Sequence, residues 1–141
     1  MTNYLLRPEV AGGLGEGTVM DVSVHPPVVT RLDYEFEDIP ADDMIATFPC
    51  VVVTDGLRAA LEESRLTGFG FSHVQVSTSL NVQELHPQLL LPGFHWLRVT
   101  GAPGRDDMWI GGRGRLIVNQ RALDVLRLHK FDNCLIEAID E

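Results

Sequence analysis

The chain has 141 residues, of which 45% are hydrophobic and 22% charged, which suffices for the core of one globular domain. Twenty acidic side chains against eleven Lys and Arg give a formal net charge of −9 at pH 7. A field of this sign repels phosphate backbones and anionic membranes, so it disfavours both as partners and suits a basic protein. The same charge is also explained by solubility alone, as in many acidic cytosolic proteins.

The sequence predicts neither export nor membrane insertion. Met1–Val10 contains Arg7 and Glu9 and lacks the continuous apolar stretch of a signal peptide. The longest apolar run is far shorter than the roughly 20 residues of a membrane-spanning helix. Cys50 and Cys134 each adjoin an apolar run, as buried free thiols commonly do. We therefore expect a soluble, cytoplasmic protein.

The first third of the chain predicts a loop and two strands. Residues 11–17 hold four glycines, which is typical of an irregular loop. Residues 18–24 alternate as a strand does, and the two prolines that follow end this strand. Residues 28–36 predict a second strand, one face of which is apolar: Leu32, Tyr34 and Phe36.

Two features predict a surface for a protein partner. The first is the most acidic segment of the chain, whose carboxylates are Asp33, Glu35, Glu37, Asp38, Asp42 and Asp43. This segment is either a contact surface for a basic partner or a solvated loop interrupted by Pro40. The second is Trp109, which is either an exposed interface anchor or a core residue beside Ile110.

The clearest structural signal is a pair of strand-helix-strand units, at about residues 50–76 and 115–138. In the first unit Val51–Val53 predicts a strand, and Thr54 an N-cap for a helix over Asp55–Arg65. Gly68 suits a left-handed helix C-cap, and Phe71–Val76 predicts the returning strand. The apolar stripe of this helix has the spacing of a buried face: Leu57, Ala60 and Leu61.

The second unit repeats this plan. Leu116–Val118 predicts the strand, Asn119 the N-cap, Asn133 a left-handed cap and Cys134–Ile136 the returning strand. Its helical stripe superposes on the first at an offset of 65 positions: Ala122, Val125 and Leu126. Only two residues between 51 and 71 are identical at that offset. The low identity favours repeated use of one local plan over a diverged duplication.

The remaining segments complete the expected fold. Leu80–Leu91 has no clear period, whereas Phe94–Thr100 predicts a strand that carries Trp96 into the core. Two short helices among seven or eight strands predict an α+β fold with a mixed, mostly antiparallel sheet. No linker divides the chain, so we expect a single domain over residues 1–141.

The sequence contains no motif for bond-making chemistry. The glycines at 13, 15 and 17 lack the spacing and the lysine of a phosphate loop. The five histidines and two cysteines show no metal-ligand spacing, and no serine lies in a nucleophile elbow. Adjacent carboxylates such as Asp42–Asp43 and Asp106–Asp107 point to opposite faces of a strand or into water. We therefore predict no enzyme activity, catalytic residue, metal or cofactor.

Three segments of the chain resemble bacterial immunity proteins of polymorphic and contact-dependent toxin systems. Val118–Leu126 resembles their C-terminal VVSERALELL-type segment, and Gly101–Asp107 resembles the turn before it. Phe48–Thr54 with Leu66–Phe69 resembles the internal partner of that module. The resemblance spans residues 45–138; Asn119–Gln120 replaces the usual Ser-Glu, and the paired CxxCG motifs of one branch are missing.

The resemblance implies a cytosolic protein that binds and neutralises a cognate toxin, many such toxins being nucleases with basic active sites. An acidic inhibitor would mimic the negatively charged substrate of such a nuclease. Two alternatives stay open. One is an adaptor or structural domain of another function; the other is a small-molecule-binding protein, or an enzyme with a site built from distant residues, recognisable by a deep, mostly apolar pocket with converging polar groups. The sequence assigns no role to residues 1–45 and no oligomeric state.

Overall fold

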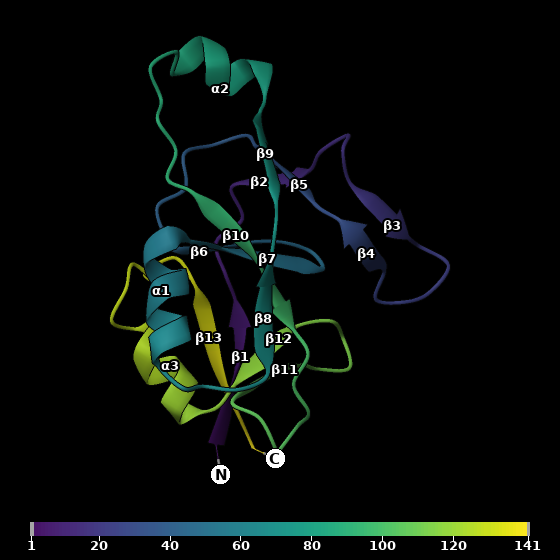
Figure 1. Cartoon of the computed structure of the whole chain (residues 1–141), viewed down its shortest axis with the longest axis vertical. Helices are drawn as coiled ribbons and strands as arrows, with labels where there is room; N and C mark the ends of the chain where they lie inside the picture. The colour runs from purple at the N-terminus through teal and green to yellow at the C-terminus, as the bar shows by residue number, and fades with distance from the viewer. Residues whose placement is uncertain (1, 141) are drawn as a thin grey trace.

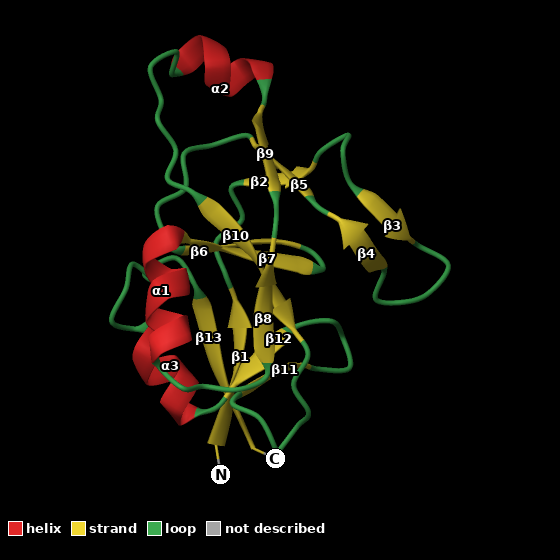
Figure 2. Ribbon diagram, in the orientation of Figure 1, coloured by secondary structure: helices red, strands yellow, loops and turns green. Residues whose placement is uncertain are grey.

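The chain folds as an α+β protein with mostly antiparallel sheets, and its computed structural model describes residues 2–140 (Figure 1). Within these residues, three helices accompany thirteen short strands, which form four sheets (Figure 2). The predicted fold class is confirmed. The predicted number of helices was two, and the additional one lies in the segment without a clear period.

Two four-stranded sheets form the main body and share one plan. Sheet A has the strand order β11 (Met108–Ile110), β12 (Leu116–Val118), β1 (Thr2–Arg7) and β13 (Leu135–Asp140). Sheet B has the order β6 (Met44–Thr47), β7 (Cys50–Thr54), β10 (Phe94–Val99) and β8 (Phe69–Ser72). Helix α3 (Gln120–Leu126) follows β12, and helix α1 (Asp55–Glu63) follows β7.

Each of these sheets takes its central strand from the other half of the chain. Strand β1 precedes the β6-β7-α1-β8 unit but is inserted between β12 and β13. Strand β10 precedes the β11-β12-α3-β13 unit but is inserted between β7 and β8. Neither unit therefore completes its own sheet, and the two halves of the chain are interlocked.

The strand registers of sheets A and B are equivalent. Each central strand has a leucine that lies opposite one residue on either side: Leu6 opposite Leu116 and Ile136, and Leu97 opposite Val51 and Phe71. The two partners of Leu6 are each 65 positions beyond the corresponding partner of Leu97. The outer hairpins also correspond, since a methionine faces the matching valine in both: Met44 with Val53, and Met108 with Val118.

Equivalent hydrogen bonds join each central strand to the start of a helix. In sheet A, the Tyr4 hydroxyl lies 2.6 Å from Oε1 of Gln120, the first residue of α3. In sheet B, Nε2 of His95 lies 2.5 Å from Oδ1 of Asp55, the first residue of α1. Register and hydrogen bonding together favour a diverged duplication over the repeated local plan that sequence identity alone favoured.

Two equivalent aspartates fasten the units to each other. Asp107, just before β11, accepts hydrogen bonds from the side chain of Asn119 at 2.8 Å and from the backbone N–H of Thr67 in the other unit at 2.8 Å. Asp43, just before β6, likewise accepts from the Thr54 hydroxyl at 3.1 Å and from the backbone N–H of Lys130 at 3.0 Å. Each carboxylate thus holds the N-cap of its own helix and the chain that follows the other helix.

Sheet B lies between two hydrophobic cores, which explains why every residue of β7 is buried. On one face, α1 and α3 lie side by side (Figure 1), and their stripes pack with Val51 and Val53. On the other face, Val52 packs with the aromatic residues of an insert. Successive side chains of a strand point to opposite faces, so both faces of β7 must be apolar.

The insert consists of a three-stranded sheet, a two-stranded ribbon and one helix. Its sheet has the order β2 (Gly12–Leu14), β5 (Asp33–Phe36) and β9 (Gln75–Thr78), the last pair being parallel. The ribbon pairs β3 (Val19–Asp21) with β4 (Val28–Arg31), and α2 (Leu80–Leu85) follows β9. Gly12 is required in β2, since a Cβ there would collide with the backbone of Glu35.

Several predicted boundaries were wrong. The glycine-rich loop contains β2, the strand expected over residues 28–36 divides into β4 and β5, and the strand expected over Phe71–Val76 divides between β8 and β9. The first helix ends at Glu63, and Arg65 is left-handed, so Gly68, with a φ of 103°, lies well beyond the helix end. Asn133 is not left-handed; its side chain instead donates to Asp42.

Both N-caps are confirmed, and so is most of each helical stripe; the exceptions are Ala60 and Val125, which are half-buried. Thr54 accepts a hydrogen bond from the backbone N–H of Leu57, and Asn119 accepts one from that of Ala122. Leu57 and Leu61 are buried, as are their counterparts in α3, Ala122 and Leu126; Leu123, which the predicted stripe did not include, is buried as well.

Truncation of either stripe should destabilise the whole domain. Leu61→Ala and Leu126→Ala are each expected to lower the free energy of unfolding by about 2–5 kcal/mol, because both leave a cavity in the shared core. Urea denaturation would measure the loss. The control is Leu128→Ala, whose side chain is 83% exposed and whose effect should stay within about 0.5 kcal/mol. An unchanged midpoint for either core variant would contradict the assigned packing.

Loss of either fastening aspartate should also be costly. Asp43→Ala and Asp107→Ala each leave several donors without a partner, which predicts a loss of about 1–3 kcal/mol in urea denaturation. The exposed Asp132, changed to alanine, is the control. An effect no larger than that of the control would show that the two units do not depend on these carboxylates.

The Asp107 bonds should also make the domain sensitive to acid. Burial raises the pKa of Asp107, but its bonds with Asn119 and Thr67 and the nearby Arg121 outweigh this, so the pKa lies below its usual 3.8. The stabilisation is therefore complete above about pH 4 and lost as the pH falls through the folded-state pKa. The stability difference between wild type and Asp107→Ala should shrink in that range, measured by urea denaturation at successive pH values.

Candidate functional site

The predicted acidic surface is divided by the fold. Asp33 is 4% exposed and accepts hydrogen bonds from the backbone of Gly17 and the hydroxyl of Ser77. Asp42 is 5% exposed and accepts from both the backbone and the side-chain amide of Asn133. These two carboxylates, like the fastening Asp43, hold the fold together, so they were wrongly placed on the contact surface.

Trp109 also lies inside the molecule. Its side chain is 2% exposed in β11, directly opposite Ile117 of β12. The structure therefore supports the interpretation of this tryptophan as a core residue and not as an interface anchor. A partner could not contact its ring without opening sheet A.

The exposed remainder of the acidic segment forms a small mixed surface. Glu37 and Asp38 are exposed, and their backbone N–H groups donate to the carbonyl of Ala11 at 2.9 and 3.1 Å. An exposed aliphatic residue adjoins each side of these bonds in the chain: Val10, 67% exposed, precedes Ala11, and Ile39, 42% exposed, follows Asp38. We call the exposed residues Val10, Glu37, Asp38 and Ile39 the acidic face. Glu35 is half-buried in β5, two residues before Glu37.

The cysteines are buried and poorly ionised. Cys50 and Cys134 are 5% and 8% exposed, and they form no disulfide. Burial raises the pKa of the Cys50 thiol to about 11, although Arg98 acts in the opposite direction. Burial likewise raises the pKa of the Cys134 thiol to about 12. Since the thiolate is the nucleophile, neither residue is prepared for nucleophilic catalysis.

His95 and Asp55 resemble part of a catalytic arrangement, but their contacts are structural. Arg58 lies 2.9 Å from Nδ1 of His95, and a guanidinium can only donate, so Nδ1 accepts and the proton lies on Nε2. Nε2 therefore donates to Asp55. No hydroxyl or thiol of the described residues is bonded to this group; its effect is to bind β10 to α1.

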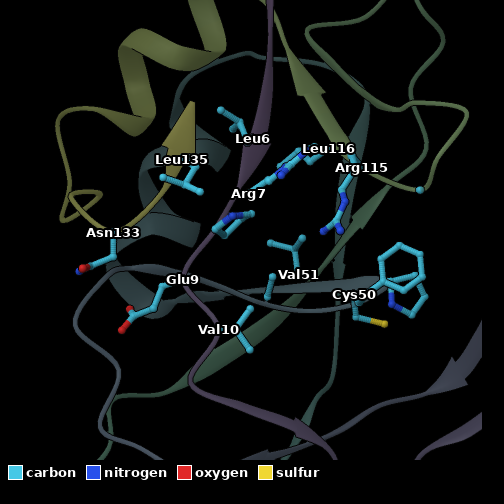
Figure 3. A pocket seen from close by; sticks show the side chains of 15 residues that line it. Leu6, Arg7, Glu9, Val10, Cys50, Val51, Arg115, Leu116, Asn133 and Leu135 are labelled. Carbon is cyan, nitrogen blue, oxygen red and sulfur yellow. The ribbon is translucent and has the colours of Figure 1, made fainter. Parts of the chain in front are cut away.

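A pocket lies where the equivalent hairpin turns meet the end of β1. It has a volume of about 450 Å³, and its walls come from residues 6–10, the β6–β7 turn, the residues leading into β12 and the start of β13. Figure 3 shows Glu9 and Asn133 at one end and Arg115 and Cys50 at the other. We call this hollow the arginine pocket, after Arg7 and Arg115. No local pattern predicts this pocket, because its residues are far apart along the chain.

Comparison with protein-family models finds no match, and comparison with curated protein sequences finds none either. Among residues 2–140, no group of three or more His, Cys, Asp and Glu side chains is arranged to hold a metal ion. No helix in this part of the chain has the length and apolar character needed to cross a membrane.

Both thiols should react slowly in the folded protein. A disulfide reagent such as DTNB at pH 8 is expected to label Cys50 and Cys134 only as the protein unfolds, because burial hinders access and suppresses the thiolate. The same reagent should label both at once in concentrated urea, which is the control. Rapid labelling of the native protein would contradict this burial.

Proposed function

We propose that the chain is a non-catalytic protein-binding protein that neutralises a cognate bacterial toxin by direct contact. The observation that carries the proposal is the acidic face. There, the backbone bonds of Glu37 and Asp38 to Ala11 join two segments, each of which exposes an aliphatic side chain, Val10 or Ile39. Protein interfaces commonly combine apolar residues at the centre with a polar rim.

The electrostatics of the chain suit a basic partner. The net charge of −9 attracts such a partner at long range, and the exposed carboxylates would orient it on arrival. The backbone bonds to Ala11 hold both halves of the face in place before binding. A surface fixed in advance loses less conformational entropy when it binds.

The kind of partner comes from the resemblance of residues 45–138 to immunity proteins. In this proposal the protein acts in the cytoplasm, and the partner is a toxin with a basic active site, such as a nuclease domain. The first test is a pull-down with the product of the neighbouring gene, followed by rescue of cells that express it. Failure of a neighbouring toxin to bind, or the absence of a toxin gene at the locus, would count against the proposal.

Charge reversal tests the acidic face itself. Glu37→Lys with Asp38→Lys should slow association with the toxin by about tenfold at low salt and reduce its salt dependence, as measured by stopped-flow binding. The control is Glu63→Lys with Glu84→Lys, which changes the net charge equally at two exposed positions on helices. On-rates that change equally in both double variants would show that only the overall charge matters.

Small-molecule binding is the second candidate function, and the arginine pocket favours it. A volume of about 450 Å³ lies within the usual range of ligand pockets. The pocket begins at Glu9 and Val10, so it adjoins the acidic face.

A further inference from the structure

The arginine pocket combines an aliphatic lining with cationic groups that lack a counter-ion. Val51 and Leu116 are 8% and 3% exposed, and Leu135, at 68%, forms part of the rim. Arg7 and Arg115 line the same hollow. Within residues 2–140, neither arginine has a carboxylate oxygen within 4.0 Å, nor does either side chain donate a hydrogen bond to the protein.

A second hollow continues the first and adds another cation. It shares Arg7, Phe48 and Arg115 with the arginine pocket and is completed by Leu5, Arg113 and Glu137. Three of the chain's eleven Lys and Arg therefore surround one depression in a protein with a net charge of −9. The three arginines outnumber the single carboxylate of the second hollow, Glu137, so their positive charge opposes the overall field and attracts an anion.

The acidic residue that lines the arginine pocket, Glu9, is already bonded elsewhere. Both carboxylate oxygens of Glu9 accept hydrogen bonds, from the backbone N–H groups of Ala41 and Asp42. The Arg115 guanidinium carbon lies 5.4 Å from the centre of the Phe48 ring. Contact with the face of a ring orients the guanidinium and leaves the N–H donors at its edge available for a carboxylate or phosphate.

We infer that the arginine pocket binds a small amphipathic organic anion. Its carboxylate or phosphate group contacts Arg7 and Arg115, and its apolar part lies against Val51, Leu116 and Leu135. The volume suits a ligand of this size, whereas an extended nucleic acid would meet the repulsion of the whole acidic surface. This inference deepens the second candidate function and is independent of toxin binding, so its failure would leave that proposal unaffected.

The test uses the full chain and four probes with the same eight-carbon tail: octanoate, octyl phosphate, octanol and octylamine. Isothermal titration and thermal denaturation should show saturable binding of at least one anion and a rise in Tm. Octanol should bind about tenfold more weakly, as expected when a charged hydrogen bond is lost, and octylamine should not bind. The tighter of the two anions identifies the preferred head group.

Variants show whether the two arginines provide the affinity. Arg7→Gln with Arg115→Gln should weaken binding of the preferred anion about tenfold or more, whereas Arg105→Gln, at an exposed turn elsewhere, should not. NMR of the wild type needs no variant: the anion should shift the amide signals of Arg115, Leu116 and Leu135, and not those of α2. Absence of anion binding, equal binding of octanol, or amide shifts confined to other regions would overturn the inference.

Discussion

The exchange of central strands is the constraint on which the rest of this structure depends. Without β10, strands β7 and β8 would lose the strand that lies between them and bonds to both. Without β1, strands β12 and β13 would lose theirs. The backbone donors and acceptors that these strands direct toward the central strand are therefore satisfied only when both halves of the chain are folded. The carboxylates of Asp43 and Asp107 strengthen this dependence, since each bonds to the backbone of the opposite unit. We regard the two units as one cooperative structure.

The exchange also places both candidate binding surfaces. Strand β1 leaves sheet A at Arg7, and the following residues pass the arginine pocket before Val10 and Ala11 reach the acidic face. One short segment thus joins a cationic hollow to an anionic surface. At the pocket, the two equivalent hairpins meet where Phe48 packs closely against Gly114, a residue whose φ of 76° suits glycine. The pocket is therefore a consequence of the duplicated plan and not a feature of either unit alone.

Local patterns predicted the helices well because their causes are local. Threonine and asparagine commonly cap a helix when they precede an amphipathic stripe, as Thr54 and Asn119 do here. The stripes at Leu61 and Leu126 have the period of a buried helical face. The strand exchange, the burial of Asp33 and Asp42 and the arginine pocket were not predictable in this way. Each depends on partners far apart in sequence, such as Asp42 with Asn133 or Arg7 with Arg115. A run of carboxylates in the sequence does not reveal which members will find backbone donors inside the fold.

Native-state hydrogen exchange tests the interlocked architecture most directly. If the central strands make the two units one structure, the amides of β1 and β10 that bond to their neighbours should exchange only through global unfolding. They should then show the same free energy and the same dependence on denaturant, equal to the values from equilibrium unfolding. The account would be contradicted if the amides fell into two groups, one in each sheet, that exchange at different free energies of opening.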